Sequence, residues 1–133
     1  MTGIRYIPKL NLIKIDGYVA EERGTTVIRR IVEKPNNPID AVLRYADFLR
    51  ERYGKNVKTE FVKSVNFDGI RFKREDGIWF YVDREGNVYV SKKDLKHPKI
   101  HVFIRYFLYG CGYKVKNAER GDKAFLKPCM RIF

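Results

Sequence analysis

An alternation of apolar and polar residues in the middle of the chain constrains its fold more than any other feature. Runs of β-forming residues at 57–63, 67–73, 78–82 and 88–91 are separated by turn residues, among them the hairpin signal Asp76-Gly77. Along these runs the apolar side chains tend to recur at every second position, the period of a strand with one buried face. The pattern predicts an antiparallel meander with one face toward a core.

Two segments carry the period of a helix instead. Residues 38–53 place apolar side chains three and four positions apart, with Asn37 as the expected cap, Pro38 at the first helical position and Gly54 as the stop. Residues 98–111 also fit a strand, but the bounding Pro98 and Gly112 favour a helix. We therefore expect helices over 38–53 and 98–111.

The remaining segments are read as further strands. An extended stretch runs from Leu10 to Val19, residues 25–33 form the returning strand, and 113–117 with 123–127 form a last hairpin. The chain has 133 residues, which is the usual length of one domain. The sequence thus predicts a single α+β domain over 1–133, with an antiparallel sheet of five or more strands packed against two helices.

The charge of the chain indicates what class of partner it meets. The formal net charge is +12, and residues 91–133 hold 11 basic residues against 3 acidic ones. An uneven basic excess of this size is typical of a surface that contacts a polyanion, most often a nucleic acid. The expected function is therefore sequence-independent binding of nucleic acid, with single-stranded DNA or RNA favoured.

The meander offers a surface for that function. If its apolar residues face the core, the other side presents cations and aromatic rings together, which is the chemistry on which bases stack while phosphates meet Lys and Arg. The residues expected on that side are Arg71, Lys73, Trp79, Tyr81 and Tyr89. The alternative is that a helix covers this face and that the rings belong to the core.

A run of lysines follows the meander. Its members are Lys92, Lys93, Lys96 and Lys99, with Arg105 further along the chain. These side chains are candidates for phosphate contacts. The alternative is a solvated loop whose lysines discourage strand pairing at the sheet edge.

A second functional hypothesis rests on three acidic residues near the strand ends, Asp68, Asp83 and Glu85. The order helix, antiparallel strands, helix, strand over roughly residues 38–117 resembles the core of the PD-(D/E)xK nucleases. The resemblance implies a Mg²⁺ site at these acids, although the motif's Lys is replaced by Glu85. The alternative is that the acids cap the turns of hairpins.

The other expectations rest on residue types and motifs that are rare or absent in the sequence. Gln is absent while Lys, Arg and Glu are plentiful, which is typical of heat adaptation, and we expect a source among thermophilic archaea or their viruses. Cys111 and Cys129 are expected as buried thiols or, in such a source, as a bridge. No metal-ligand spacing, signal segment or membrane span is evident, so we expect a cytoplasmic protein without a cofactor. A third hypothesis is a virion or scaffold module that self-associates through exposed aromatic residues.

Overall fold

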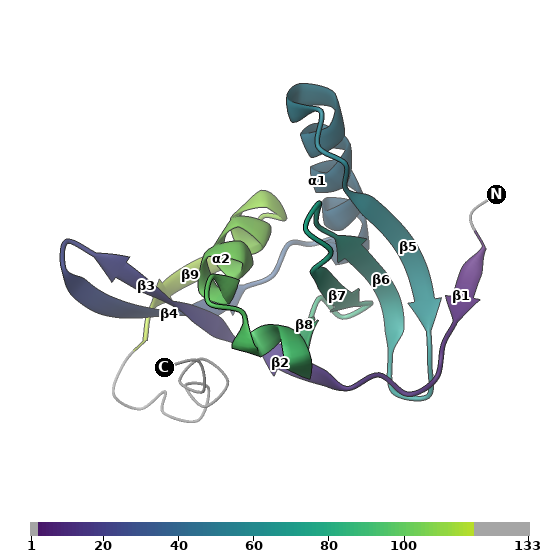
Figure 1. The fold of residues 1–133 in the computed structure, drawn as a ribbon, viewed down its shortest axis with the longest axis horizontal. Coiled ribbons are helices and arrows are strands. Elements are labelled where there is room, and N and C mark those ends of the chain that lie inside the picture. The colour runs from purple at the N-terminus through teal and green to yellow at the C-terminus, as the bar shows by residue number, and fades with distance from the viewer. Residues whose placement is uncertain (1–2, 119–133) are drawn as a thin grey trace.

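The computed structural model describes residues 3–118 and arranges their strands in two sheets (Figure 1). The large sheet has the order β1 (Ile4–Tyr6), β5 (Lys58–Lys63), β6 (Asp68–Lys73), β7 (Trp79–Asp83), β8 (Val88–Ser91) and β2 (Leu12–Ile15). The small sheet has the order β3 (Gly17–Glu22), β4 (Thr25–Glu33) and β9 (Lys114–Asn117). The expected α+β class is therefore correct, but one sheet was expected where there are two.

Helix α1 (Pro38–Tyr53) has the predicted bounds. Pro38 occupies the first turn, and Asp40 pairs with Arg44 one turn on, with 2.7 Å between the charged atoms. The left-handed Gly54 ends the helix, and its N–H donates to the Arg50 carbonyl. Asn37 precedes the helix but its side chain makes no capping hydrogen bond, contrary to the expected cap. The buried face of α1 packs against β5, β6 and β7.

Helix α2 (Ile100–Gly110) confirms the choice of helix over strand but starts two residues later than expected. A 3-10 turn, η1 (Lys92–Lys96), precedes it, and Pro98 lies between the two. Ile100, Ile104 and Phe107 are buried at helical spacing, and α2 packs against β3. Gly110 lets the end of α2 approach α1, because a Cβ atom there would overlap the ring of Tyr45.

The extended stretch at 10–19 divides between the two sheets. Ile15 pairs with Val88 in the large sheet, whereas Gly17 pairs with Arg30 in the small sheet. The large sheet is also mixed rather than antiparallel, because the three-residue strand β1 runs parallel to β5. These pairings join segments far apart in sequence, so the local pattern that predicted the strands did not predict their partners.

The last described strand departs from the nuclease-like order. Strand β9 pairs with β4 in the small sheet, and a fourth meander strand, β8, lies between β7 and α2. The topological resemblance to the PD-(D/E)xK core is therefore restricted to α1 and the first three meander strands. The second arm of the expected last hairpin, 123–127, and Cys129 lie outside the described residues.

The apolar side chains form two clusters, one on each side of the large sheet. The larger cluster lies between the sheets and the helices and includes Phe72, Phe80 and Phe107. The smaller cluster contains Val62, Phe67 and Tyr81 and is covered by residues 7–11, the segment between β1 and β2 that we call the strap. None of the helices within residues 3–118 is both long and apolar enough to cross a membrane.

Candidate nucleic-acid interface

The surface predicted to bind nucleic acid lies on the side of the large sheet that faces away from α1 and α2, which we call the outer face. The strand register sets its side chains in rows, because paired residues of neighbouring strands point to the same side. The outer-face residues are Lys58, Glu60 and Val62 on β5, Arg71 and Lys73 on β6, Trp79, Tyr81 and Asp83 on β7, Tyr89 on β8, and Leu12 and Lys14 on β2. All five sheet residues of the expected site are thus on one face.

Arg71 and Trp79 form the centre of this face. The Arg71 guanidinium carbon lies 3.9 Å from the centroid of the Trp79 ring, and the Lys73 ammonium lies 5.4 Å from it. Glu60 holds Arg71 in place, since Arg71 Nε donates to Glu60 Oε1 at 2.6 Å. Arg5 Nε donates to the other carboxylate oxygen of Glu60 at 3.2 Å. One face of the indole is therefore occupied by a cation, and the ring, which also packs against the cluster of Val62, Phe67 and Tyr81, is partly exposed.

Tyr81 is not available for stacking, contrary to the expectation for this residue. It is 4% exposed, and Phe67 packs edge-on against its ring with 5.5 Å between ring centroids. The strap adds Ile7 and Leu10 to the same cluster. The alternative of a covered face is thus correct for Tyr81, although the strap and Phe67 supply the cover instead of a helix.

Tyr89 is tied to the hairpin between β7 and β8. Its hydroxyl donates to Asp83 Oδ2 at 2.9 Å, and Phe67 packs edge-on against its ring. Burial, together with the hydrogen bond to Asp83, raises the pKa of Tyr89 to about 12. The phenol therefore remains a neutral donor to Asp83 at physiological pH, and its ring is partly covered.

The accessible part of the outer face is one end of the sheet. Lys73 pairs with both Lys58 and Trp79, which makes a row of two lysines and an indole across three strands. Phe80 pairs with Val90, so β8 ends beside the start of β7 and leads directly into the exposed Lys92 and Lys93. The structure thus brings two separately predicted groups of cations to the same end of the large sheet.

The other expected cations lie elsewhere. Lys96 and Lys99 are exposed; Lys96 ends the 3-10 turn η1 that begins at Lys92, and Lys99 directly precedes α2. Arg105 lies on α2, on the core side of the large sheet, with its guanidinium carbon 5.8 Å from the centroid of the Tyr109 ring. These three residues are not part of the outer face.

The three acids of the nuclease hypothesis line a cavity of about 380 Å³ at the opposite end of the sheet. Asp83 is engaged by the turn: Oδ1 accepts from the backbone N–H groups of Glu85 and Asn87, and Oδ2 accepts from the side chains of Asn87 and Tyr89. Asp68 pairs with Arg84 at 3.3 Å. Within residues 3–118 no group of three or more His, Cys, Asp or Glu side chains is arranged so that it could hold a metal ion. The arrangement around Asp83 is that of a carboxylate organising a hairpin turn.

Comparison with known proteins adds no relative. No protein-family model, no curated protein and no solved structure matches the chain. The function must therefore be argued from the residues of this fold alone.

Three residues of the outer face did not emerge from the sequence. Lys58 and Glu60 lie four and two positions before Val62 on β5, so all three side chains point to the same face. The alternation of side chains along a strand, applied to β5 as well, would have identified them. Asn66 is different, because both ends of its side-chain amide hold the strap. Its Oδ1 accepts from the Leu10 N–H, and its Nδ2 donates to the Leu10 carbonyl. No local pattern indicates a contact between residues 56 positions apart.

Proposed function

We propose that this protein binds single-stranded nucleic acid, without sequence specificity, across the Trp79 end of the outer face. The observation that carries the proposal is the row of Lys58, Lys73 and Trp79, at the end of the sheet where β8 leads into Lys92 and Lys93. Such a row presents several cations to successive phosphates and a ring to one base.

The charge balance of the face supports a polyanionic ligand. Its acids are Glu60 and Asp83, and both are engaged, Glu60 by Arg5 and Arg71 and Asp83 by the hairpin turn. Lys58 is exposed and Lys73 is partly exposed, so both reach solvent near Trp79. With a net charge of +12 for the whole chain, long-range attraction of a polyanion adds to these local contacts.

The geometry favours electrostatic contacts over base stacking. Trp79 has Arg71 on one ring face, and the Tyr81 ring is buried, so we expect a single stacking contact where the sequence predicted three. A single strand fits such a surface, because its unpaired bases can reach an isolated ring while phosphates follow the lysines. We expect affinity to fall steeply with salt.

Fluorescence anisotropy with labelled single-stranded DNA, single-stranded RNA and duplex DNA, titrated across salt, tests the proposal. The double variant Lys58→Ala, Lys73→Ala removes two expected phosphate contacts, so the slope of log affinity against log salt should become shallower by about 1.4 on a single strand. The charge-matched control is Arg44→Ala, Arg52→Ala on α1, which changes net charge equally but lies outside the outer face. Equal weakening by both double variants, or no binding at low salt, would contradict the proposal.

Trp79 supplies a second readout, because it is the chain's single tryptophan. Binding of unlabelled single strands should quench its fluorescence. Trp79→Ala should weaken single-strand binding by about 1–3 kcal/mol, the range for one base–aromatic stack, with little effect on duplex binding. An unquenched signal on saturation, or equal weakening of both ligands, would remove stacking from the mechanism.

A further inference from the structure

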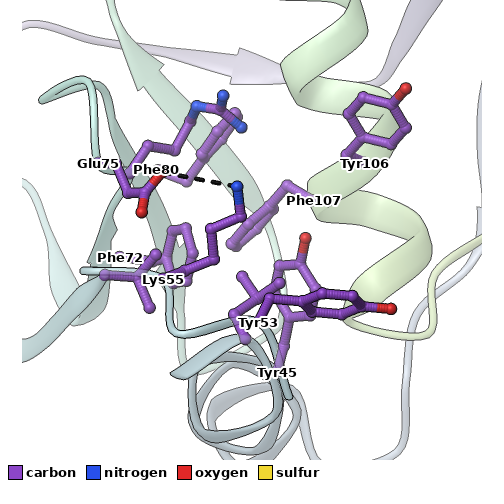
Figure 2. Close-up of a pocket in the computed structure, with 11 residues that line it drawn as sticks. Tyr45, Tyr53, Lys55, Phe72, Glu75, Phe80, Tyr106 and Phe107 are labelled. Atoms are coloured by element: carbon purple, nitrogen blue, oxygen red, sulfur yellow. Dashed lines mark ion pairs between the residues drawn. The ribbon is translucent and has the colours of Figure 1, made fainter. Parts of the chain in front are cut away.

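A second cavity, on the opposite side of the large sheet, belongs to no part of the proposed function. It measures about 500 Å³ and lies between α1, α2 and the start of the β6–β7 hairpin (Figure 2). Its lining comes from segments that only the tertiary fold brings together: Tyr45 and Tyr53 from α1, Phe72 and Phe80 from the sheet, and Phe107 from α2. The volume falls in the range of pockets that hold small organic molecules.

The floor and walls of this cavity are aromatic. Phe80 and Phe107 stack with 4.5 Å between centroids and an interplanar angle of 7°. Tyr45 stacks on Phe72 at 5.6 Å and meets Phe107 edge-on at 6.2 Å. These three phenylalanines are buried and hold the aromatic wall in place, whereas Tyr53 and Tyr106 are exposed and Tyr45 is partly exposed. The surface that a ligand can reach is therefore made of tyrosine rings, and its preferred partner is another flat ring.

The mouth of the cavity is polar and is lined by Lys55, Arg74 and Glu75. Arg74 is already engaged, because its Nε pairs with Asp76 at 3.3 Å and its guanidinium carbon lies 3.7 Å from the centroid of the Phe103 ring. Figure 2 shows the Lys55 ammonium directed toward the Glu75 carboxylate, 3.6 Å away, and both side chains are 48% exposed. An ion pair this exposed is weak, so Lys55 can exchange Glu75 for an anionic ligand at little cost.

Tyr45 adds a polar group inside the cavity. No residue among 3–118 hydrogen-bonds its hydroxyl, and burial raises its pKa, which keeps the phenol protonated. The Gly110 contact described above fixes the Tyr45 ring against the end of α2. The cavity thus has a positioned donor on its aromatic wall and an exposed ammonium group, Lys55, at its mouth.

We propose that this cavity binds a small molecule made of a planar aromatic ring and an acidic group, with the ring against Tyr45, Tyr53 and Tyr106 and the acid at Lys55. Two kinds of molecule share this chemistry, mononucleotides and aromatic carboxylic acids. Phe72 and Phe80 point to the core side of the sheet whereas Trp79 points to the outer face, so this site is separate from the proposed nucleic-acid surface. It does not depend on the proposed function.

Isothermal titration calorimetry with the intact chain tests the proposal. The probes are adenosine monophosphate and 2-naphthoate, each compared with counterparts that lack one feature: adenosine and 2-naphthalenemethanol lack the acid, and inorganic phosphate and acetate lack the ring. We expect at least one complete probe to bind about tenfold or more tighter than its single-feature counterparts, since a charge-assisted contact adds to ring burial. Binding by only one of the two probes identifies the source of the ligand.

Two variants locate the binding. Lys55→Ala should reduce the affinity of the complete probe about tenfold and leave that of its uncharged counterpart unchanged, whereas Tyr53→Ala should weaken both. Arg44→Ala and Tyr6→Ala are the matched controls, because both residues are exposed and lie outside the cavity. Lys58→Ala, Lys73→Ala should leave probe binding intact, which separates failure of this inference from failure of the proposed function.

Three results would overturn the inference. The first is that neither complete probe binds at millimolar concentration. The second is that each complete probe binds no tighter than its counterparts. The third is that Lys55→Ala and Arg44→Ala weaken the complete probe equally, which would show a general charge effect rather than a site.

Discussion

The two faces of the large sheet are made by the same strands but are buried in different ways. On the core face, Phe72, Phe80 and Val82 pack against two helices and belong to a cluster that extends into the small sheet. On the outer face, Val62 and Tyr81 are covered by Phe67 and the strap, with Leu12, Trp79 and Tyr89 packed around them, and no helix contributes to this cluster within the described residues. The core face is therefore closed by long regular elements, and the outer face by a few residues of irregular chain.

Because of this difference, the core face mainly stabilises the fold, and the outer face keeps side chains that a ligand can reach. A face buried under helices contributes most of the folding free energy and leaves its side chains few alternatives. A face covered by a short strap retains accessible side chains at one end, where Lys58 is exposed and Lys73 and Trp79 are partly exposed. Substitutions on the two faces should therefore change stability by different amounts.

The largest effect is expected from truncating neighbouring residues of β7 on opposite faces. Phe80 is fully buried and stacks on Phe107, so Phe80→Ala should lower the free energy of unfolding by about 3–5 kcal/mol. Trp79 is partly exposed, and Trp79→Ala should cost about 1–2 kcal/mol in stability. Urea denaturation of both variants measures the difference. Equal losses would mean that the outer face is as tightly packed as the core.

The strap should be the weakest part of the outer-face cover. Asn66→Ala removes two hydrogen bonds to the Leu10 backbone, of 3.0 and 2.6 Å, and should destabilise the protein by about 1–2 kcal/mol. Hydrogen exchange should accelerate in residues 7–11 but not in α1 or α2. Asn56→Ala is the control, since that exposed asparagine makes its hydrogen bond to Glu75 through its backbone N–H. Acceleration throughout the chain would show that the strap does not open separately.

Ionisation of Tyr89 on the outer face should make the stability of the protein depend on pH. Its folded-state pKa of about 12 lies above the unfolded value of 10.0, so its contribution to stability is complete below pH 10 and is lost as pH rises toward 12. Tyr89→Phe should cost about 1 kcal/mol at neutral pH, because Asp83 keeps its other donors, and should reduce the stability loss between pH 10 and 12. Thermal denaturation across this range, with the exposed Tyr6→Phe as control, provides the test. An unchanged alkaline profile would assign the loss to other tyrosines.

The smallest stability effect is expected at Glu60, together with a gain in binding. Glu60→Gln removes the counter-ion of Arg5 and Arg71 and should change the free energy of unfolding by less than about 1 kcal/mol. The Arg5 guanidinium, whose side chain is 60% exposed, then becomes available to phosphates, so single-strand affinity should rise about threefold and the salt dependence should steepen. Glu51→Gln on α1 makes the same charge change away from this face. If the two variants bind equally, the gain reflects net charge alone.

Local patterns predicted much of the fold for a physical reason. Helix α1 combines a 3.6-residue apolar period with Pro38 and Gly54 at its ends, and all of these act within a few residues. The alternation that assigned Phe72 and Phe80 to one face and Arg71 and Trp79 to the other is likewise local. Strand β1 lacked such a signal, since it has three residues and depends on pairing with β5.

The candidate site was predicted in composition but not in accessibility. The sequence placed Arg71, Trp79 and Tyr81 on one face, but the burial of Tyr81 depends on Phe67 and on the strap, which Asn66 holds. Likewise, the lysines after β8 were found as a run, while their position beside Trp79 follows from the register of β7 with β8. Contacts of this kind depend on loop closure over many residues, which no short pattern encodes.

The positions of the helices and of most strands, the two-faced character of the meander and the positive charge of the chain follow from the order of the amino acids alone. Periodicity, turn residues and charge are properties of neighbouring residues, so they can be read without a fold. Only the tertiary structure decided that the strands form two sheets, that the strap covers Tyr81 and leaves Trp79 partly exposed, and that Tyr45, Phe72 and Phe107 enclose a cavity. Those outcomes depend on which distant segments pack together, and that choice is made by the whole chain as it buries its apolar surface.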